Sequence, residues 1–209
     1  MPLIQTSAPG VEPLTRDEAK SHLRVDADYT VDDALIDMLI GAARIAAETQ
    51  TARSLISQGW RLVLDRFPGS VDMWLPDVFQ LPGNAILLER GPLLAVSSIT
   101  YTDMGGVQQT LTSGTDYVVD ASGPIPRITP PFGRIWPIPL PQIGAVRVDY
   151  TAGYGTTAAS VPAGIRHWML LRVASLYEHR EEAAVMQRGT VNALPWVDGL
   201  LDPYRVVWA

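Results

Sequence analysis

The chain has 209 residues, 47% of them hydrophobic, and a formal net charge of −6 because 22 acidic residues outnumber 16 lysines and arginines. This length and apolar content suffice for one domain, or for one domain with a large insertion. The sequence contains no cysteine, which excludes disulfide scaffolds, thiolate nucleophiles and cysteine-based zinc sites. An acidic balance argues against tight binding of DNA phosphates, because that task needs clustered cations.

The first ten residues, MPLIQTSAPG, lack the basic-then-apolar order of a secretory signal. No apolar run approaches the roughly 20 residues that span a bilayer. We therefore expect a protein that is made in a cytoplasm, soluble at synthesis, and has no membrane partner.

Two helices are predicted near the N-terminus. The first covers residues 14–25, because Thr15 can cap its free amides and Glu18 completes a capping box. The second covers residues 31–52, where polar residues recur at steps of four and three along one stripe. The residues of this stripe are Asp33, Asp37, Gly41, Arg44 and Glu48. The remaining circumference is mostly apolar, so this helix is expected to need partners on two sides.

The pattern changes to strict alternation at residue 58, which predicts a β-rich region. Further strands are expected at residues 85–89, 95–102, 107–112, 117–120 and 145–151, separated by glycine-containing turns. Their spacing favours a small antiparallel sheet or barrel. Residues 123–141 hold seven of the 17 prolines, and each proline lacks the amide that a sheet ladder needs. We therefore expect no central strand in this stretch.

Helical signals return after Pro162, with a mostly buried helix at residues 165–177 and a short helix or turn at 194–201. The predicted fold class is α+β. It consists of an α-helical bundle, formed by two N-terminal helices and the C-terminal helices, with an inserted antiparallel β-rich region. The expected parts are an N-terminal helical part (1–56), the β-rich insertion with its proline-rich loop (57–155), and C-terminal helices with a docking tail (156–209).

No pattern in the sequence predicts catalysis. The chain lacks a Gly-x-Ser-x-Gly elbow, a Walker loop and a His-Glu-x-x-His pair, and the Gly-Tyr-Gly at 153–155 lacks the third glycine of a dinucleotide fingerprint. His22, His167 and His179 are dispersed. The acidic pairs at 32–33 and 181–182 are interpreted as helix-end charges. We expect no catalytic residue, no cofactor and no metal.

Two of the six tryptophans stand in unusual places. Trp136 lies in the proline-rich loop and Trp208 at the end of the chain, so neither has an obvious core of its own subunit to enter. Exposed tryptophan is a frequent anchor of protein interfaces. The alternative is that both fold back onto their own subunit, since tryptophan is highly buried on average.

Four segments together resemble the head-tail connector family of tailed phages, also called adaptor or head completion proteins, which includes the adaptors of gene transfer agents. They are PLTRDEAKSHLRVD (13–26), DDALIDMLIGAARIAAETQTARSLISQGWRLVLDRFP (32–68), VRVDYTAGYG (146–155) and VPAGIRHWMLLRVASLYEHRE (161–181). Their order also matches. The resemblance covers most of the chain and is weakest at residues 71–83 and 123–144.

The resemblance implies a structural subunit of a virion or phage-like particle at the head-tail junction. Such subunits form a ring, usually dodecameric, between the portal protein and the tail or a stopper protein. DNA passes through the central channel without sequence-specific binding. An acidic chain with a single lysine is compatible with unhindered passage.

Three groups of residues are predicted to make contacts in such a ring. The C-terminal segment resembles the one that family members dock on the portal: Leu201, Pro203, Tyr204, Arg205, Val206, Val207 and Trp208. The two highly apolar helices are predicted to meet neighbouring subunits through Leu35, Leu39, Ile40, Trp168 and Leu171. The proline-rich loop is predicted to contact the tail side or a neighbour through Ile135, Trp136 and Pro137.

Two other classes of protein remain open at this point. A small enzyme would assemble a site from scattered acids and His167, and would show a polar, convergent pocket. A free-standing β-rich module for carbohydrate or a host surface would bind its ligand through the sheet.

Overall fold

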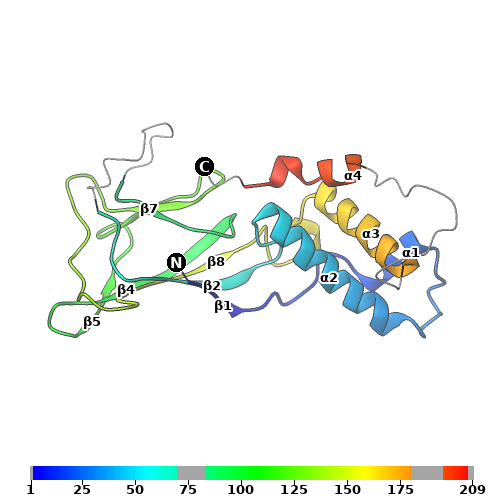
Figure 1. The fold of residues 1–209 in the computed structure, drawn as a ribbon, viewed down its shortest axis with the longest axis horizontal. Coiled ribbons are helices and arrows are strands. Elements are labelled where there is room, and N and C mark those ends of the chain that lie inside the picture. The colour runs from blue at the N-terminus through cyan, green and yellow to red at the C-terminus, as the bar shows by residue number, and fades with distance from the viewer. Residues whose placement is uncertain (1, 70–82, 180–194, 207–209) are drawn as a thin grey trace, which may run out of the picture. The chain divides into compact units, whose positions relative to one another are not determined.

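The computed structural model describes residues 2–69, 83–179 and 195–206 and has a mixed α/β fold (Figure 1). The chain divides into two compact units. The β unit consists of Met1–Ala8 with Ser57–Gly153, and the helical unit of Pro9–Ile56 with Tyr154–Ala209.

Helix α1 (Arg16–Leu23) begins at the predicted capping box. The Thr15 hydroxyl accepts a hydrogen bond from the Glu18 amide at 3.2 Å, and the Glu18 carboxylate accepts one from the Thr15 amide at 2.9 Å. These two bonds satisfy amides that the first turn of a helix otherwise leaves free. The helix ends at Arg24, whose φ of 59° is left-handed. The helix predicted at 14–25 is thus confirmed.

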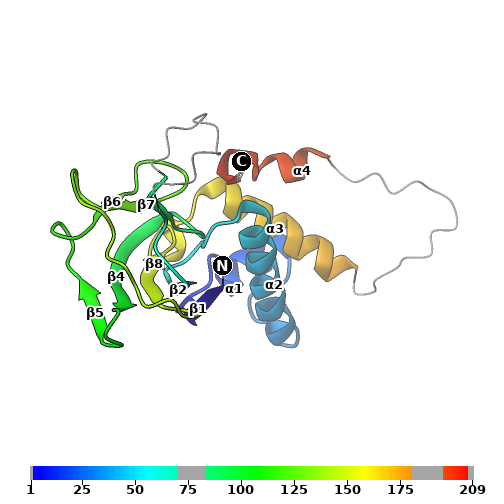
Figure 2. The same cartoon turned by 60° about the vertical axis from the view of Figure 1, so that its left-hand side comes forward.

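Helices α2 (Asp33–Thr51) and α3 (Ala163–Glu178) form the centre of the helical unit and lie side by side (Figures 1 and 2). Both predicted helices, at 31–52 and 165–177, are confirmed. The side chains buried between them are apolar and include Ile36, Ile40, Ala43, Ile165, Trp168, Met169 and Val173. The burial of α3 explains its apolar sequence, since a helix covered on several sides needs few polar residues.

A short helix, α4 (Pro195–Gly199), and a 3-10 turn, η2 (Asp202–Tyr204), follow at the end of the described chain. They match the short helix or turn predicted at 194–201. Leu201 between them is fully buried in the helical core. The indole nitrogen of Trp168 donates to the Asp198 carboxylate at 3.2 Å, which links α4 to α3.

A five-stranded antiparallel sheet forms most of the β unit, in the order β1-β2-β8-β4-β5. Its strands are β1 (Leu3–Ser7), β2 (Gln58–Leu64), β8 (Val146–Ala152), β4 (Leu93–Thr102) and β5 (Gln108–Leu111). The central strand β8 buries every second side chain, as a strand with one face on a core must. The strands predicted from residue 58 and at 95–102, 107–112 and 145–151 are confirmed.

Strand β1 was not predicted from the sequence. Residues 3–7 were expected in the N-terminal helical part, whereas they pair with β2 at the sheet edge, with Leu3 opposite Leu62. Five residues are too few for alternation to be read reliably at a chain end.

A second, three-stranded antiparallel sheet has the order β3-β7-β6, with β3 (Ile86–Leu87), β7 (Arg127–Thr129) and β6 (Val118–Asp120). The expectation that residues 123–141 contain no central strand was wrong. Strand β7 is central because Arg127, Ile128 and Thr129 form a proline-free triplet. Ile128 is fully buried and lies opposite Ile86 on one side and Val119 on the other.

Candidate assembly surfaces

The polar residues considered for chemistry are separated or engaged in ion pairs. Among residues 2–69, 83–179 and 195–206, no three His, Asp or Glu side chains come together as a metal site. His167 and His179 are exposed on α3 and at its end. Asp32 accepts a hydrogen bond from the Tyr177 hydroxyl, and Glu181-Glu182 lies outside the described residues. No helix within the described chain is long and apolar enough to cross a membrane.

The first acidic residues of α2 tie this helix to α1. The buried Lys20 ammonium lies 2.6 Å from the Asp33 carboxylate and donates to the carbonyl oxygens of Ala27 and Tyr29. Arg16 bridges Asp33, at 2.8 Å, and Asp37. The hydrogen bond from Lys20 and the charge of Arg16 hold the pKa of Asp33 below its usual range.

The second half of α2 is tied to the segments on either side of it. Arg44 pairs with Glu12 at 2.8 Å and with Glu48 at 3.0 Å. The other Glu48 oxygen accepts from the amide of Leu55 at 3.0 Å. Together with Asp33 and Asp37, these pairs engage every charged residue of α2 inside the helical unit.

The side of α2 that faces away from its buried core residues is exposed and uncharged. We define the α2 stripe as its exposed residues at steps of four and three: Ala34, Met38, Ala42, Ile45 and Thr49. Met38 is 62% exposed and Ile45 57%. Such a surface is costly in water, at about 25 cal/mol per Å² of apolar area. The second apolar side predicted from the sequence therefore exists and is uncovered in the described subunit.

Three predicted ring-contact residues occupy the core of their own subunit instead. Leu39, Ile40 and Trp168 are 8%, 2% and 1% exposed, so they have almost no surface to offer a neighbour. Leu35 and Leu171 are half-buried. Periodicity alone could not separate the core residues of α2 from its exposed apolar residues, because apolar side chains occupy most of the helix circumference. The exposed side falls on Met38 and Ile45, which the prediction of contact residues omitted.

The C-terminal segment is anchored to its own helical unit as far as Val206. The Val206 amide donates to the Thr51 carbonyl at 3.0 Å, and the Arg53 guanidinium donates to the Tyr204 carbonyl at 2.6 Å. A Cβ at position 164 would lie 3.3 Å from the Tyr204 ring, so Gly164 permits this close packing.

This anchoring corrects the prediction of a docking tail that begins at residue 201. Leu201, Tyr204 and Val206 contact their own subunit, whereas Pro203 and Arg205 are exposed. Val207 and Trp208 lie outside the described residues.

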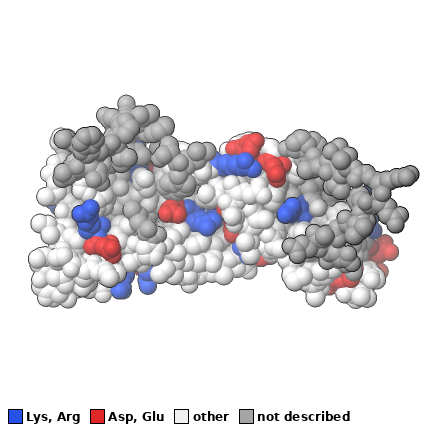
Figure 3. All heavy atoms as spheres, in the orientation of Figure 1, with Lys and Arg blue, Asp and Glu red and all other residues white. Residues whose placement is uncertain are grey.

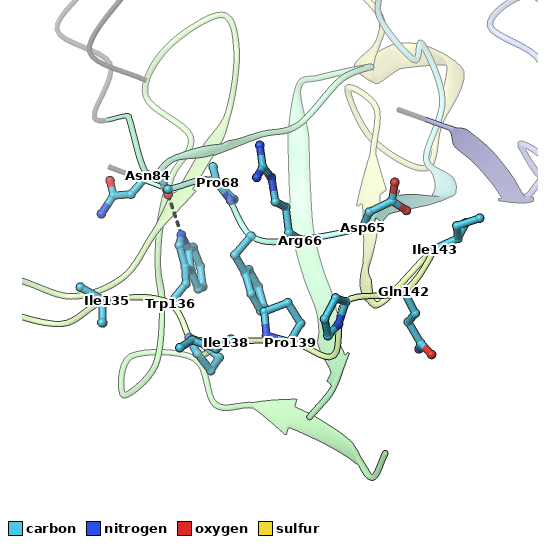
Figure 4. A pocket seen from close by; sticks show the side chains of 14 residues that line it. Asp65, Arg66, Pro68, Asn84, Ile135, Trp136, Ile138, Pro139, Gln142 and Ile143 are labelled. Atoms are coloured by element: carbon cyan, nitrogen blue, oxygen red, sulfur yellow. Dashed lines mark hydrogen bonds between the residues drawn. The ribbon is translucent and has the colours of Figure 1, made fainter. Parts of the chain in front are cut away.

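Trp136 is only 7% exposed, so the expectation that it has no core of its own to enter was wrong. Its ring stacks on Phe67 at a centroid distance of 4.8 Å. The indole nitrogen donates to the Asn84 carbonyl at 2.6 Å (Figure 4). Contact of this loop with the tail side or a neighbour remains a prediction, and it rests on Ile135, which is 87% exposed, and on the half-buried Pro137.

The loop around Trp136 borders an open groove of about 800 Å³ in the β unit. Its walls are mainly apolar and include Phe67, Pro68, Trp136, Ile138, Pro139 and Pro141. Ile135 and Ile143 lie toward opposite ends of it (Figure 4).

Four large apolar side chains of the same loop are directed to solvent. We define the loop patch as Phe132, Ile135, Ile138 and Ile143, whose exposed fractions are 107%, 87%, 75% and 93%. Phe132 precedes Gly133, which lies in a turn and has a left-handed φ of 76°. An aromatic residue next to a turn glycine is a sequence signal of an exposed apolar side chain, and this residue was not among the predicted contacts. These side chains do not form the polar, convergent pocket that an enzyme would need.

Of the comparisons with known proteins, the one with solved structures gives matches. No protein-family model matches the sequence, and no curated protein matches it. The whole chain is similar to 97% of a chain from the neck of an empty gene transfer agent particle, computed with C6 symmetry, at 27% identity and a TM-score of 0.78. The predicted resemblance to the head-tail connector family is confirmed.

Two further structures give the same result. A chain in the virion of a native gene transfer agent particle matches with 27% identity and a TM-score of 0.78. A chain in the neck of a native particle, computed with C12 symmetry, matches with 25% identity and a TM-score of 0.73. In each case all of this chain is covered, so the likeness to chains of gene transfer agent particles includes both the helical unit and the β unit.

The anchoring of the C-terminus predicts different effects for two truncations. A chain that ends at Val206 keeps the bonds to Thr51 and Arg53, so its unfolding free energy should equal that of the full chain. A chain that ends at Asp202 loses these bonds and the Tyr204 packing, which should cost about 2–4 kcal/mol. Urea unfolding followed by circular dichroism measures both, and equal stability of the two truncations would contradict the anchoring.

The ion pairs of α1 and α2 predict a loss of stability in acid. Hydrogen bonds from the Thr15 amide to Glu18, from Lys20 to Asp33 and from Arg16 to Asp37 lower the pKa of each carboxyl. A carboxylate with a lowered folded-state pKa stabilises the fold above its unfolded pKa of about 4, and this contribution disappears as the pH falls through the folded value.

We therefore expect the urea midpoint to be level above about pH 5 and to fall below it. The variant Glu18→Gln should show a shallower fall, because one of the titrating groups is gone. A midpoint that stays constant when the pH falls well below the unfolded pKa of about 4 would refute the role of these pairs.

Proposed function

We propose that this protein is a head-tail connector subunit, a structural part of a virion neck that assembles as a ring between the portal protein and the tail or stopper. The observation that carries this proposal is the similarity over the whole chain to components of gene transfer agent particles, two of them from necks computed with C6 and C12 symmetry. In this role the protein acts by assembly and performs no reaction.

The distribution of charge supports passage of DNA through such a ring. Arg16, Lys20, Arg44, Arg61 and Arg166 each pair with a carboxylate of the same chain. On the face drawn in Figure 3, cationic and anionic side chains lie next to one another, and no broad patch has a single sign. A surface of this kind gives phosphates few free cations, so DNA would pass without being held.

The terminal residues Val207 and Trp208 are proposed to dock on the portal. The residues before them are anchored by Thr51 and Arg53, which fixes the point from which a terminal segment can extend. A tryptophan near the end of a chain can contribute strongly to binding when it enters a pocket of a partner.

The proposal predicts the behaviour of the protein with its portal. Co-expression with the portal protein of the same genome should yield a complex whose electron-microscopic class averages show a ring of sixfold or twelvefold symmetry. The chain truncated after Val206 is the matched control. It should fold normally and fail to co-purify with the portal.

Two results would count against the proposal. A full-length protein that stays monomeric and does not co-purify with the portal would refute the connector role. Undiminished portal binding by the truncated chain would refute docking through Val207 and Trp208 and leave the ring untouched.

A further inference from the structure

Among the described residues, each unit has an exposed group of apolar side chains that no other described part of that unit covers. In the helical unit it is the α2 stripe, with Met38 and Ile45 as its largest members, 62% and 57% exposed. In the β unit it is the loop patch, where every member is at least 75% exposed. The two surfaces differ in structure, since the first is one face of a regular helix and the second is a proline-rich loop.

The members of both surfaces carry no charge themselves. The charged residues of α2 are paired with α1, Glu12 and one another. Within the loop, Arg134 lies 3.7 Å from Asp116. Burial of these uncharged side chains favours an occupant that is itself apolar.

The loop is suited to binding because it is already ordered. Trp136 is held by its stack on Phe67 and by its bond to Asn84, and the neighbouring prolines restrict the backbone. A rigid surface loses little conformational entropy on association. The α2 stripe is complementary in character, because Met38 is flexible enough to fill irregular gaps and Ala34 and Ala42 allow close approach.

If the protein forms a closed ring, as the proposed function states, the geometry of the ring limits which surfaces of neighbouring subunits can meet. A closed ring of identical chains needs two different surfaces on each subunit, one for each neighbour. Contact of a surface with its own copy would instead close a dimer. We propose that the α2 stripe of one subunit packs against the loop patch of the next, so that a head-to-tail contact covers both surfaces.

The lack of cysteine in the sequence makes this contact directly testable by disulfide trapping. The double variant Met38→Cys/Ile135→Cys, assembled with the portal and oxidised, should give a ladder of covalent oligomers on a denaturing gel. The matched control is Ser175→Cys/Ile135→Cys, because Ser175 is exposed on α3, away from the α2 stripe. The control should form the same ring and remain monomeric on the gel.

The single variants show whether the contact joins two different surfaces or two copies of the same surface. Met38→Cys alone and Ile135→Cys alone should give no covalent dimer, since like surfaces do not meet, whereas a mixture of the two should give one. A covalent dimer from either single variant would overturn the head-to-tail arrangement.

The outcomes also separate this inference from the function on which it rests. A symmetric ring that forms with the double variant but shows no ladder would overturn the proposed contact and leave the connector role standing. Absence of a ring in the unsubstituted protein would overturn both.

Discussion

Helix α2 carries apolar side chains on two opposite sides, and the described residues of the helical unit cover only one of them. The inner side, with Ile36, Ile40 and Ala43, forms the core with α3. The outer side leaves Met38 and Ile45 in solvent. No described residue of the helical unit covers that outer side, so its apolar side chains are best explained as a surface for another chain.

The ion pairs determine which side of α2 faces outward. Asp33 and Asp37 are bound by α1, and Arg44 and Glu48 by the segments next to the helix. These pairs fix the rotation of α2 about its axis, and the uncharged side follows as the exposed one. Their contribution to stability is modest where they are exposed, but their contribution to orientation connects the helical core to the proposed assembly surface.

Local signals in the sequence were sufficient to predict most helices and strands. They were not sufficient to predict which distant residues pack against them. The capping box at Thr15 and the period-two strands depend on neighbouring residues, so they could be predicted. Strand β7 could not, because Ile128 stands between prolines and is fixed by pairing with distant strands. The burial of Trp136 depends on Phe67, far away in the chain. The burial of Leu39 and Ile40 in their own subunit could not be predicted either, because the partners of Asp37 and its neighbours cannot be read from helical periodicity.

If the two exposed apolar surfaces meet in the assembled ring, their side chains must be buried there. The most direct test is a cryo-electron microscopic reconstruction of the protein bound to its portal, at a resolution that traces side chains. The account predicts a ring in which Met38 and Ile45 of each subunit are buried against Phe132 and Ile135 of the next. A ring in which these side chains remain in solvent would contradict it.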